Sequence, residues 1–143
     1  MLPESSPPEL QNSFNALLAP LLLNSALAAI RAQPQSSANA MIAIANATRA
    51  LNKLELDNAD RGTSCQQSQL IIQSHDTLLA KALYRRALAH AYLKTEEHAE
   101  KDLVDASRLV PDDAAIAAKL TQIRQQRKEK REKEKKAYKK LFS

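Results

Sequence analysis

Apolar residues recur at steps of three and four over most of this chain, the spacing that aligns side chains on one face of an α-helix. The pattern predicts a short helix over residues 10–18 and a second from about Pro20 to Ala32. Pro20 separates them in this prediction because proline removes a backbone donor and crowds the preceding turn, which interrupts or re-aims a helix. Residues 1–9 contain three prolines and two serines and are predicted to be disordered, with Ser6 able to cap the first helix and Pro7 able to open it.

A loop and a further helix complete a first predicted hairpin. The polar segment 33–40 is typical of a loop in which Ser36 or Ser37 caps the following helix. That helix is predicted to reach about Leu56, antiparallel to its predecessor. The polar stretch 57–74 has no sustained period, so it predicts a surface loop.

The second predicted hairpin has clearer boundaries. One helix runs over residues 75–94, Thr95 caps the next, and that helix covers Glu96 to about Leu109, where Pro111 stops it. Asp112 and Asp113 then favour the positive start of a final helix. The first half of this last helix carries an apolar stripe, and its second half is charged nearly all round and predicted to project into water.

Composition supports an all-α protein in one domain. The chain has 143 residues, one glycine and 3% aromatic residues, and it is rich in strong helix formers. A single cysteine, Cys65, cannot form an internal disulfide, and no secretory signal pattern opens the chain, so we expect a cytoplasmic protein. The most apolar run, 17–30, contains Pro20 and polar residues, and we expect no membrane contact.

The positive charge belongs to the C-terminal tail. The net charge is +5, whereas residues 124–140 contain ten Lys or Arg and three Glu, leaving the rest of the chain at −2. No aromatic residue interleaves with the charges of 124–136, so we expect a solvated helix and no nucleic-acid partner. The alternative is that this basic tail is itself the element of the chain that binds a partner.

Residues 80–113 fit a helical repeat of 34 residues. Small residues fall where two crossing helices approach most closely: Ala87, Ala99 and Ala106. The large residues Leu83 and Leu103 fall between these positions, and Pro111 ends the unit. Residues 19–57 fit a second such repeat with an insertion in its turn. Residues 10–18 are then a possible remnant of a preceding repeat, 58–79 a linker, and 114–143 a capping helix with a basic tail. The predicted fold is all-α, made of tetratricopeptide-type hairpins in a right-handed α-solenoid.

The run KALYRRA, the acidic turn and the basic helix ending KKAYKKLF resemble the C-terminal half of the large immunophilins, most closely the forty-kilodalton cyclophilins. In that family, three tetratricopeptide repeats follow a peptidyl-prolyl isomerase domain and bind the acidic C-terminal peptide of a heat-shock chaperone. The resemblance implies peptide-binding roles for Asn24, Lys81 and Arg85. The isomerase domain and most of the first repeat are missing from the pattern, so we expect a fragment of such a cochaperone without enzyme activity.

The cationic pair also has a physical rationale. Lys81 and Arg85 lie four residues apart on one helix face, where their repulsion is relieved by a bound carboxylate. Asn24 would add an amide that donates to a carboxylate or a peptide backbone. The alternatives are that the pair is solvated surface and that Asn24 is a buried polar group. We assign Tyr84 to packing between helices and Arg86 to the surface.

Catalytic chemistry finds no support in the sequence. Ser74, His75 and Asp76 are consecutive, so they cannot align as a triad. His90, His98 and Cys65 do not have the paired spacing of zinc ligands. A phosphate-binding loop needs several glycines, and the chain has one. We therefore expect no catalytic residue, no metal and no cofactor. The functional alternatives are a chaperone-tail adaptor with weak self-association, a fragment of a prolyl isomerase, and a general protein-interaction scaffold.

Overall fold

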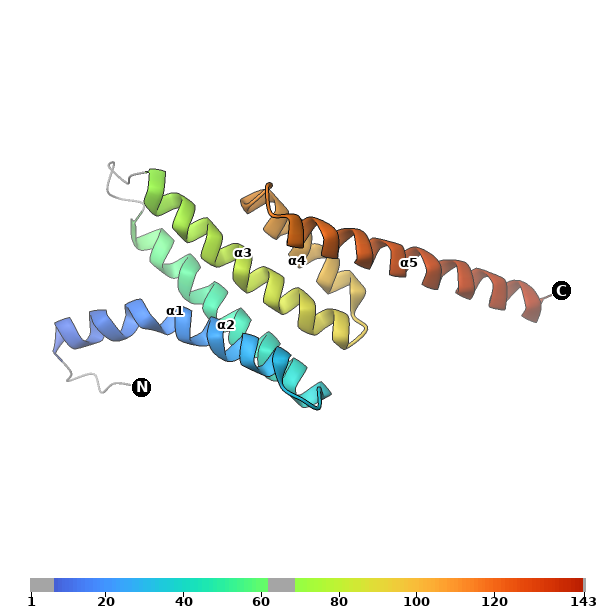
Figure 1. Ribbon diagram of the computed structural model, residues 1–143, viewed down its shortest axis with the longest axis horizontal. Coiled ribbons are helices and arrows are strands. Elements are labelled where there is room, and N and C mark those ends of the chain that lie inside the picture. Colours follow the sequence, from blue (N-terminus) through green and yellow to red (C-terminus); the bar gives the residue numbers. More distant parts are fainter. Residues whose placement is uncertain (1–6, 62–68, 143) are drawn as a thin grey trace.

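The structure is a computed structural model that describes residues 7–61 and 69–142, and these residues form helices with no strand among them. The helices are α1 (Pro8–Arg31), α2 (Ser37–Arg61), α3 (Gln69–Tyr92), α4 (Glu96–Leu109) and α5 (Ala114–Leu141). The all-α prediction is confirmed. Figure 1 shows α1 against α2 and α3 against α4, while the end of α5 projects beyond the other helices.

The two hairpins lie side by side through their helices α2 and α3, and α1 also contacts α3. Small residues at the predicted crossing positions of the second hairpin, and at the matching positions of the repeat fitted to residues 19–57, are completely buried: Ala87, Ala99 and Ala106, and Ala26, Ala43 and Ala50. Because alanine lets two helix backbones approach closely, this pattern fixes the crossings. The tetratricopeptide-like architecture follows from these positions.

Pro20 lies inside a continuous helix, so the predicted break between two helices was wrong. The helix survives because Ala19 and Leu23 are buried in the packed body on either side of the proline. The carbonyl of Ala16, which loses its helical donor to Pro20, belongs to an exposed residue where water is accessible. Figure 1 shows α1 changing direction along its length, so the predicted re-aiming is present as a bend.

Both ends of the predicted central loop are helical. Helix α2 continues to Arg61, and an ion pair of 2.8 Å between Lys53 and Asp57 links consecutive turns where the sequence predicted a loop. Helix α3 begins at Gln69, six residues before the predicted start. The remainder of the predicted linker, 62–68 with Cys65, lies outside the described residues. The same is true of residues 1–6, whereas Pro8 and Glu9, predicted to be disordered, belong to α1.

The helix caps largely follow the predictions. The Ser36 hydroxyl accepts from the backbone of Asn39, and the Asp113 carboxylate accepts from the backbone N–H groups of Ala115 and Ile116. Thr95 precedes α4 as predicted, but its hydroxyl donates back to the carbonyl of His90.

Helix α3 ends two residues earlier than predicted. Lys94 takes a left-handed conformation with φ 63°, and the backbone N–H groups of Lys94 and Thr95 donate to the carbonyls of Ala91 and His90. This is the Schellman arrangement, in which glycine is the usual residue at the left-handed position. Because a lysine occupies this position, no glycine marks the end of the helix in the sequence.

Candidate functional site: a cationic surface between α1 and α3

Arg85 joins the first helices of the two hairpins. Its Nη1 atom on α3 donates a hydrogen bond of 2.6 Å to the backbone carbonyl of Leu23 on α1. The guanidinium is therefore half-buried between α1 and α3 and has further N–H groups left to donate. This contact fixes the predicted site residue Arg85 beside the turn of α1 that carries Asn24.

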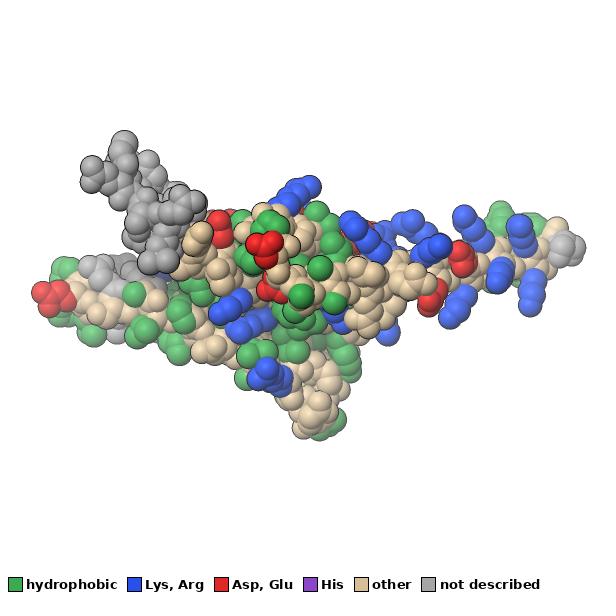
Figure 2. Space-filling model, turned by 45° about the horizontal axis from the view of Figure 1, so that its top comes forward, with side chains coloured by type: hydrophobic (Ala, Val, Ile, Leu, Met, Phe, Trp, Pro, Cys, Tyr) green, Lys and Arg blue, Asp and Glu red, His purple; other side chains and the backbone are tan. Residues whose placement is uncertain are grey.

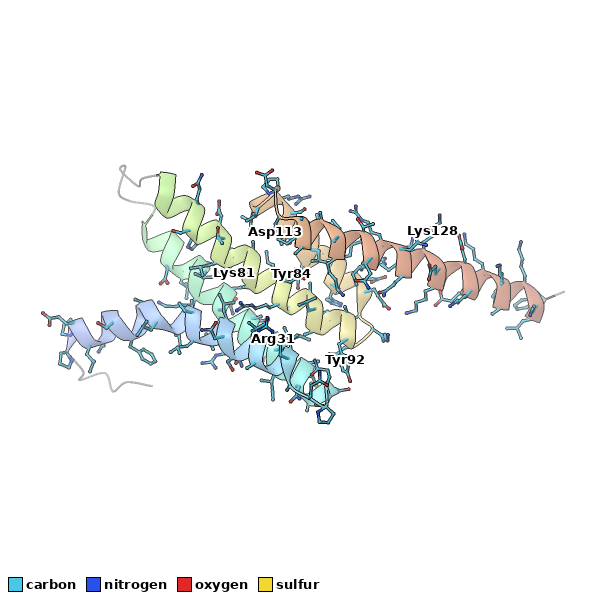
Figure 3. The ribbon with its side chains drawn as sticks, in the orientation of Figure 1. Arg31, Lys81, Tyr84, Tyr92, Asp113 and Lys128 are labelled. Carbon is cyan, nitrogen blue, oxygen red and sulfur yellow. The ribbon has the colours of Figure 1, made fainter. Side chains whose placement is uncertain are left out.

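Asn24 and Lys81 are both exposed. Asn24 directly follows Leu23, the residue whose carbonyl holds Arg85, so the structure brings Asn24 and Arg85 together. Lys81 lies one turn before Arg85 on the same side of α3, and Figure 3 labels it there. The alternative that Asn24 is a buried polar group is wrong, because its side chain is open to solvent.

A further cation, Arg31, belongs to this surface and was missed by the sequence reasoning. It lies seven residues after Asn24, which places it on the same face of α1 two turns later. Burial lowers the pKa of Arg85, and the positive charge of Arg31 lowers it further. The two guanidinium groups therefore repel each other across α1 and α3. The only sequence signal was the seven-residue step from Asn24.

The cationic surface is defined here as Asn24, Arg31, Lys81 and Arg85. Within the part of the chain that the structure describes, no ion pair involves any of its three cations. Like charges that lie close together favour a bound anion, which relieves their repulsion. A carboxylate is suited to this surface because arginine binds it through parallel N–H groups and lysine adds a point charge.

An apolar hollow of about 110 Å³ opens beside Lys81. It lies between α3 and the start of α5, and its lining is mostly apolar: Thr77, Ala80, Lys81, Tyr84, Val110, Asp113, Ala115 and Ile116. Tyr84 packs against the buried core, so its assignment to packing between helices is confirmed. The hollow has room for a small aliphatic side chain next to the charge of Lys81.

Arg86 is not a free surface residue, and its sequence-based assignment was wrong. Its Nε and Nη2 atoms each donate a 2.7 Å hydrogen bond to the carboxylate of Asp102 on α4, and Nη1 donates to Thr48 on α2. The hydrogen bond to Asp102 raises the pKa of Arg86. Neighbouring arginines in α3 thus have different environments. Arg86 pairs with the Asp102 carboxylate, whereas Arg85 pairs with no carboxylate in the described part of the chain.

The basic helix α5 is docked at its beginning and solvated at its end. Three cations of α5 pair with three glutamates of α4: Arg124 and Arg127 with Glu100, Arg127 with Glu97, and Lys130 with Glu96. Beyond Lys130 the described residues of α5 are exposed, as predicted. Figure 2 shows Lys and Arg side chains on the visible sides of this projecting end.

Helix α1 is long and apolar enough, by length and composition alone, to cross a membrane. Its most apolar window has a mean hydropathy of 1.6 and is 29% buried. The expectation of no spanning segment relied on Pro20, on the polar Asn24 and Ser25, and on the short length of the run 17–30. The continuous helix of 24 residues removes the interruption at Pro20 and the limit of length. The same length and composition occur in the core helices of soluble proteins and in signal sequences. In the structure Leu22, Leu23 and Ala26 of this window are buried in the body.

Metal ligands do not cluster in the described residues. No group of three or more His, Cys, Asp or Glu side chains there could hold a metal ion. His90 and His98 stack with ring centroids 5.1 Å apart, and the Nδ1 atom of His90 lies 3.0 Å from the Thr95 hydroxyl. The two rings therefore pack against each other at the end of the second hairpin.

Comparison with known proteins points to one group of relatives. The chain is 32% identical over 143 residues to a protein named peptidyl-prolyl cis-trans isomerase D from Mycosarcoma maydis, and 37% identical over 142 residues to one of the same name from Cryptococcus neoformans var. neoformans serotype D. A third, from Eremothecium gossypii, is 40% identical over 94 residues. The chain is homologous to part of these isomerases. No protein-family model and no solved structure matches it.

The extent of the match separates the chain from whole isomerases. It covers 100%, 99% and 66% of this chain but 34%, 33% and 26% of the three relatives. The chain therefore spans about a third of the length of the relatives that match all of it. The predicted resemblance to forty-kilodalton cyclophilins is confirmed. Since residues 7–61 and 69–142 contain no strand, no β-barrel isomerase domain lies within them.

Proposed function

We propose that this chain is a cochaperone-type binding module that captures the acidic C-terminal peptide of a heat-shock chaperone in the cytoplasm. The observation that carries the proposal is the half-buried Arg85, which is held against α1 by the Leu23 carbonyl. The cations that flank it have no carboxylate partner among residues 7–61 and 69–142. Homology to cyclophilin-type isomerases supports a role beside chaperones.

Each residue of the cationic surface has a distinct role in this proposal. Arg85 and Lys81 bind the terminal carboxylate and the carboxylate next to it, because a guanidinium fork and an ammonium together satisfy several oxygens. Asn24 donates its amide to the peptide backbone. Arg31 binds an acidic side chain further along the peptide. The hollow beside Lys81 takes an aliphatic side chain of the same peptide.

Calorimetric titration with the peptide Met-Glu-Glu-Val-Asp tests the proposal. Lys81→Ala and Arg31→Ala should each weaken binding about tenfold or more, because each removes a charge-assisted hydrogen bond. The matched controls are Lys101→Ala and Arg49→Ala, which remove the same residue types from exposed positions on α4 and α2. The same peptide with an amidated C-terminus should also bind more weakly.

Charge reversal gives the sharpest result. Arg85→Glu should abolish binding, with retained helicity in circular dichroism showing that the hairpins are still folded. Unchanged affinity in Arg85→Glu, or equal affinity for the free and amidated peptides, would reject the proposed site.

A further inference from the structure

One side of α1 carries a stripe of exposed residues, with the half-buried Phe14 among them, that has the spacing of a helix-packing seam. Seven positions follow one another at alternating steps of four and three: Leu10, Phe14, Leu17, Leu21, Asn24, Ala28 and Arg31. Leu10, Leu17 and Leu21 are 50%, 59% and 58% exposed. Figure 2 shows hydrophobic side chains on the projecting end of α1. We call these seven residues the α1 seam.

The α1 seam is distinct from the face of α1 that builds the core. Ala19, Leu22, Leu23 and Ala26 are buried against the other helices. Helix α1 is therefore apolar on two sides, and the described residues of the chain cover only one of them. A helix that is apolar nearly all round is normally buried all round. Exposed leucines at steps of seven and four fit the grooves of another helix in the manner of a coiled coil.

The charges of α1 determine which way a second α1 would run. Glu9 in the first turn and Arg31 in the last turn are the only charged residues of this helix. A parallel pair would place like charges at both ends. An antiparallel pair instead brings each Glu9 toward the Arg31 of the other copy, and it also sets the bulky Phe14 near the small Ala28. The sequence of α1 is thus complementary to itself in the antiparallel direction.

We propose that the α1 seam is a homodimer interface in which two copies of this chain pair through antiparallel α1 helices. The seam supplies the leucines that exclude water along the contact, and Glu9 and Arg31 set the direction. The contact has two-fold symmetry, so it closes after two copies.

The proposed dimer has a consequence for the cationic surface, and this consequence rests on the proposed function. Asn24 and Arg31 belong both to the α1 seam and to the cationic surface. In the antiparallel pair the partner's Glu9 reaches Arg31 and supplies a carboxylate where an acidic peptide would bind. Dimerisation and peptide binding therefore compete, and each weakens the other by the same factor.

Sedimentation equilibrium of the full chain over micromolar to millimolar concentrations tests the dimer. The wild type should be a reversible dimer, and Leu17→Glu should weaken dimerisation about tenfold or more because the charge enters the contact from both copies. Leu56→Glu is the matched control, since Leu56 is 65% exposed on α2 and lies outside the seam. Circular dichroism of both variants checks that the helices persist. A wild type that stays monomeric, or a Leu17→Glu variant that associates like the wild type, would overturn the proposal.

A charge swap tests the direction of pairing. Glu9→Arg and Arg31→Glu should each weaken the dimer, because each places like charges together, and the double variant should restore it. Equal association in the four proteins would overturn the antiparallel arrangement. Monomeric protein that instead binds to neutral phosphatidylcholine vesicles would replace the dimer with a membrane contact of α1.

The two proposals can fail separately. If Leu17→Glu is monomeric and binds the acidic peptide more tightly than the wild type, both hold. If the peptide does not bind to any variant while Leu17→Glu still abolishes the dimer, only the peptide function falls. If the peptide binds equally well to dimeric wild type and monomeric Leu17→Glu, the competition is rejected.

Discussion

Arg86 of α3 and Asp102 of α4 form a bidentate pair in which both hydrogen bonds measure 2.7 Å. Asp102 is only 3% exposed, so the Arg86 guanidinium takes the place of water around its carboxylate. Asp102→Ala should lower the free energy of unfolding by about 3 kcal/mol, because it leaves the partly buried charge of Arg86 without the carboxylate that it pairs with. Urea denaturation followed by circular dichroism measures this change.

The surface pair of Asp105 and Arg108 is the control for that prediction. Their side chains are 41% and 77% exposed, and their separation of 3.6 Å is loose. Asp105→Ala should therefore cost at most about 1 kcal/mol. Equal losses in Asp102→Ala and Asp105→Ala would mean that Arg86 and Asp102 do not hold the second hairpin together.

Close approach of α3 and α4 depends on small side chains. Ala106 is completely buried at a crossing position. Ala106→Leu should destabilise the fold by about 1–3 kcal/mol, because the added atoms force the helices apart. Ala118→Leu places the same residue on the exposed side of α5, where it should change the melting temperature little. If the two variants have the same melting temperature, α3 and α4 pack less closely at their crossing than the burial of Ala106 indicates.

The histidine stack predicts a loss of stability in acid. Burial lowers the pKa of His90, the charges of His98 and Arg86 lower it further, and Asp102 opposes them. Folded His90 therefore binds a proton less readily than unfolded His90, whose pKa is near 6.5. The stabilisation of the fold by neutral His90 is therefore complete above this unfolded-state pKa, and it declines as the pH falls through that value.

The pH dependence of His90→Gln tests this sign. Its free energy of unfolding should fall less steeply with decreasing pH below about 6.5 than that of the wild type. His98→Gln should keep most of the wild-type dependence of the free energy of unfolding on pH, because His98 lowers the pKa of His90 less than burial does. An identical slope in His90→Gln and the wild type would exclude His90 as the titrating group.

Docking of α5 on α4 should depend on salt. Glu100 accepts from Arg124 at 3.1 Å and also pairs with Arg127. Glu100→Gln should cost about 1 kcal/mol in low salt and less in high salt, because partly exposed ion pairs are screened. Urea denaturation at both ionic strengths measures this, with Glu129→Gln on the solvated part of α5 as the control. A loss that is the same at both ionic strengths would contradict an ionic contact.

The elements predicted best from sequence were those with local signals. Ser36 and Asp113 could be recognised as helix starts, because a short polar side chain accepts hydrogen bonds from backbone N–H groups within the next three residues. The buried alanines could also be predicted, since their spacing repeats with the helical hairpin. Lys94 could not, because the left-handed turn occurs at a residue that does not usually favour it.

The features that sequence reasoning missed depend on distant partners. The role of Arg86 is set by Asp102, sixteen residues away on another helix, and the continuity of α1 through Pro20 is set by burial on both sides of the ring. The candidate site was predicted in part. Spacing located Lys81 and Arg85, whereas the contribution of Arg31 emerged only when α1 was placed against α3.

The projecting end of α5 determines how far its C-terminal tip lies from the hairpins. Ile123 is its last buried residue, and the exposed rings of Tyr138 and Phe142 lie 4.6 Å apart at its tip. Ion pairs hold α5 against α4 as far as Lys130, and at 1.5 Å per residue the helix from there to Leu141 is about 17 Å long. It acts as a stiff spacer, so a molecule held by the aromatic tip would stay roughly that distance from the hairpins. Adding or removing one helical turn would change that reach by about 5 Å.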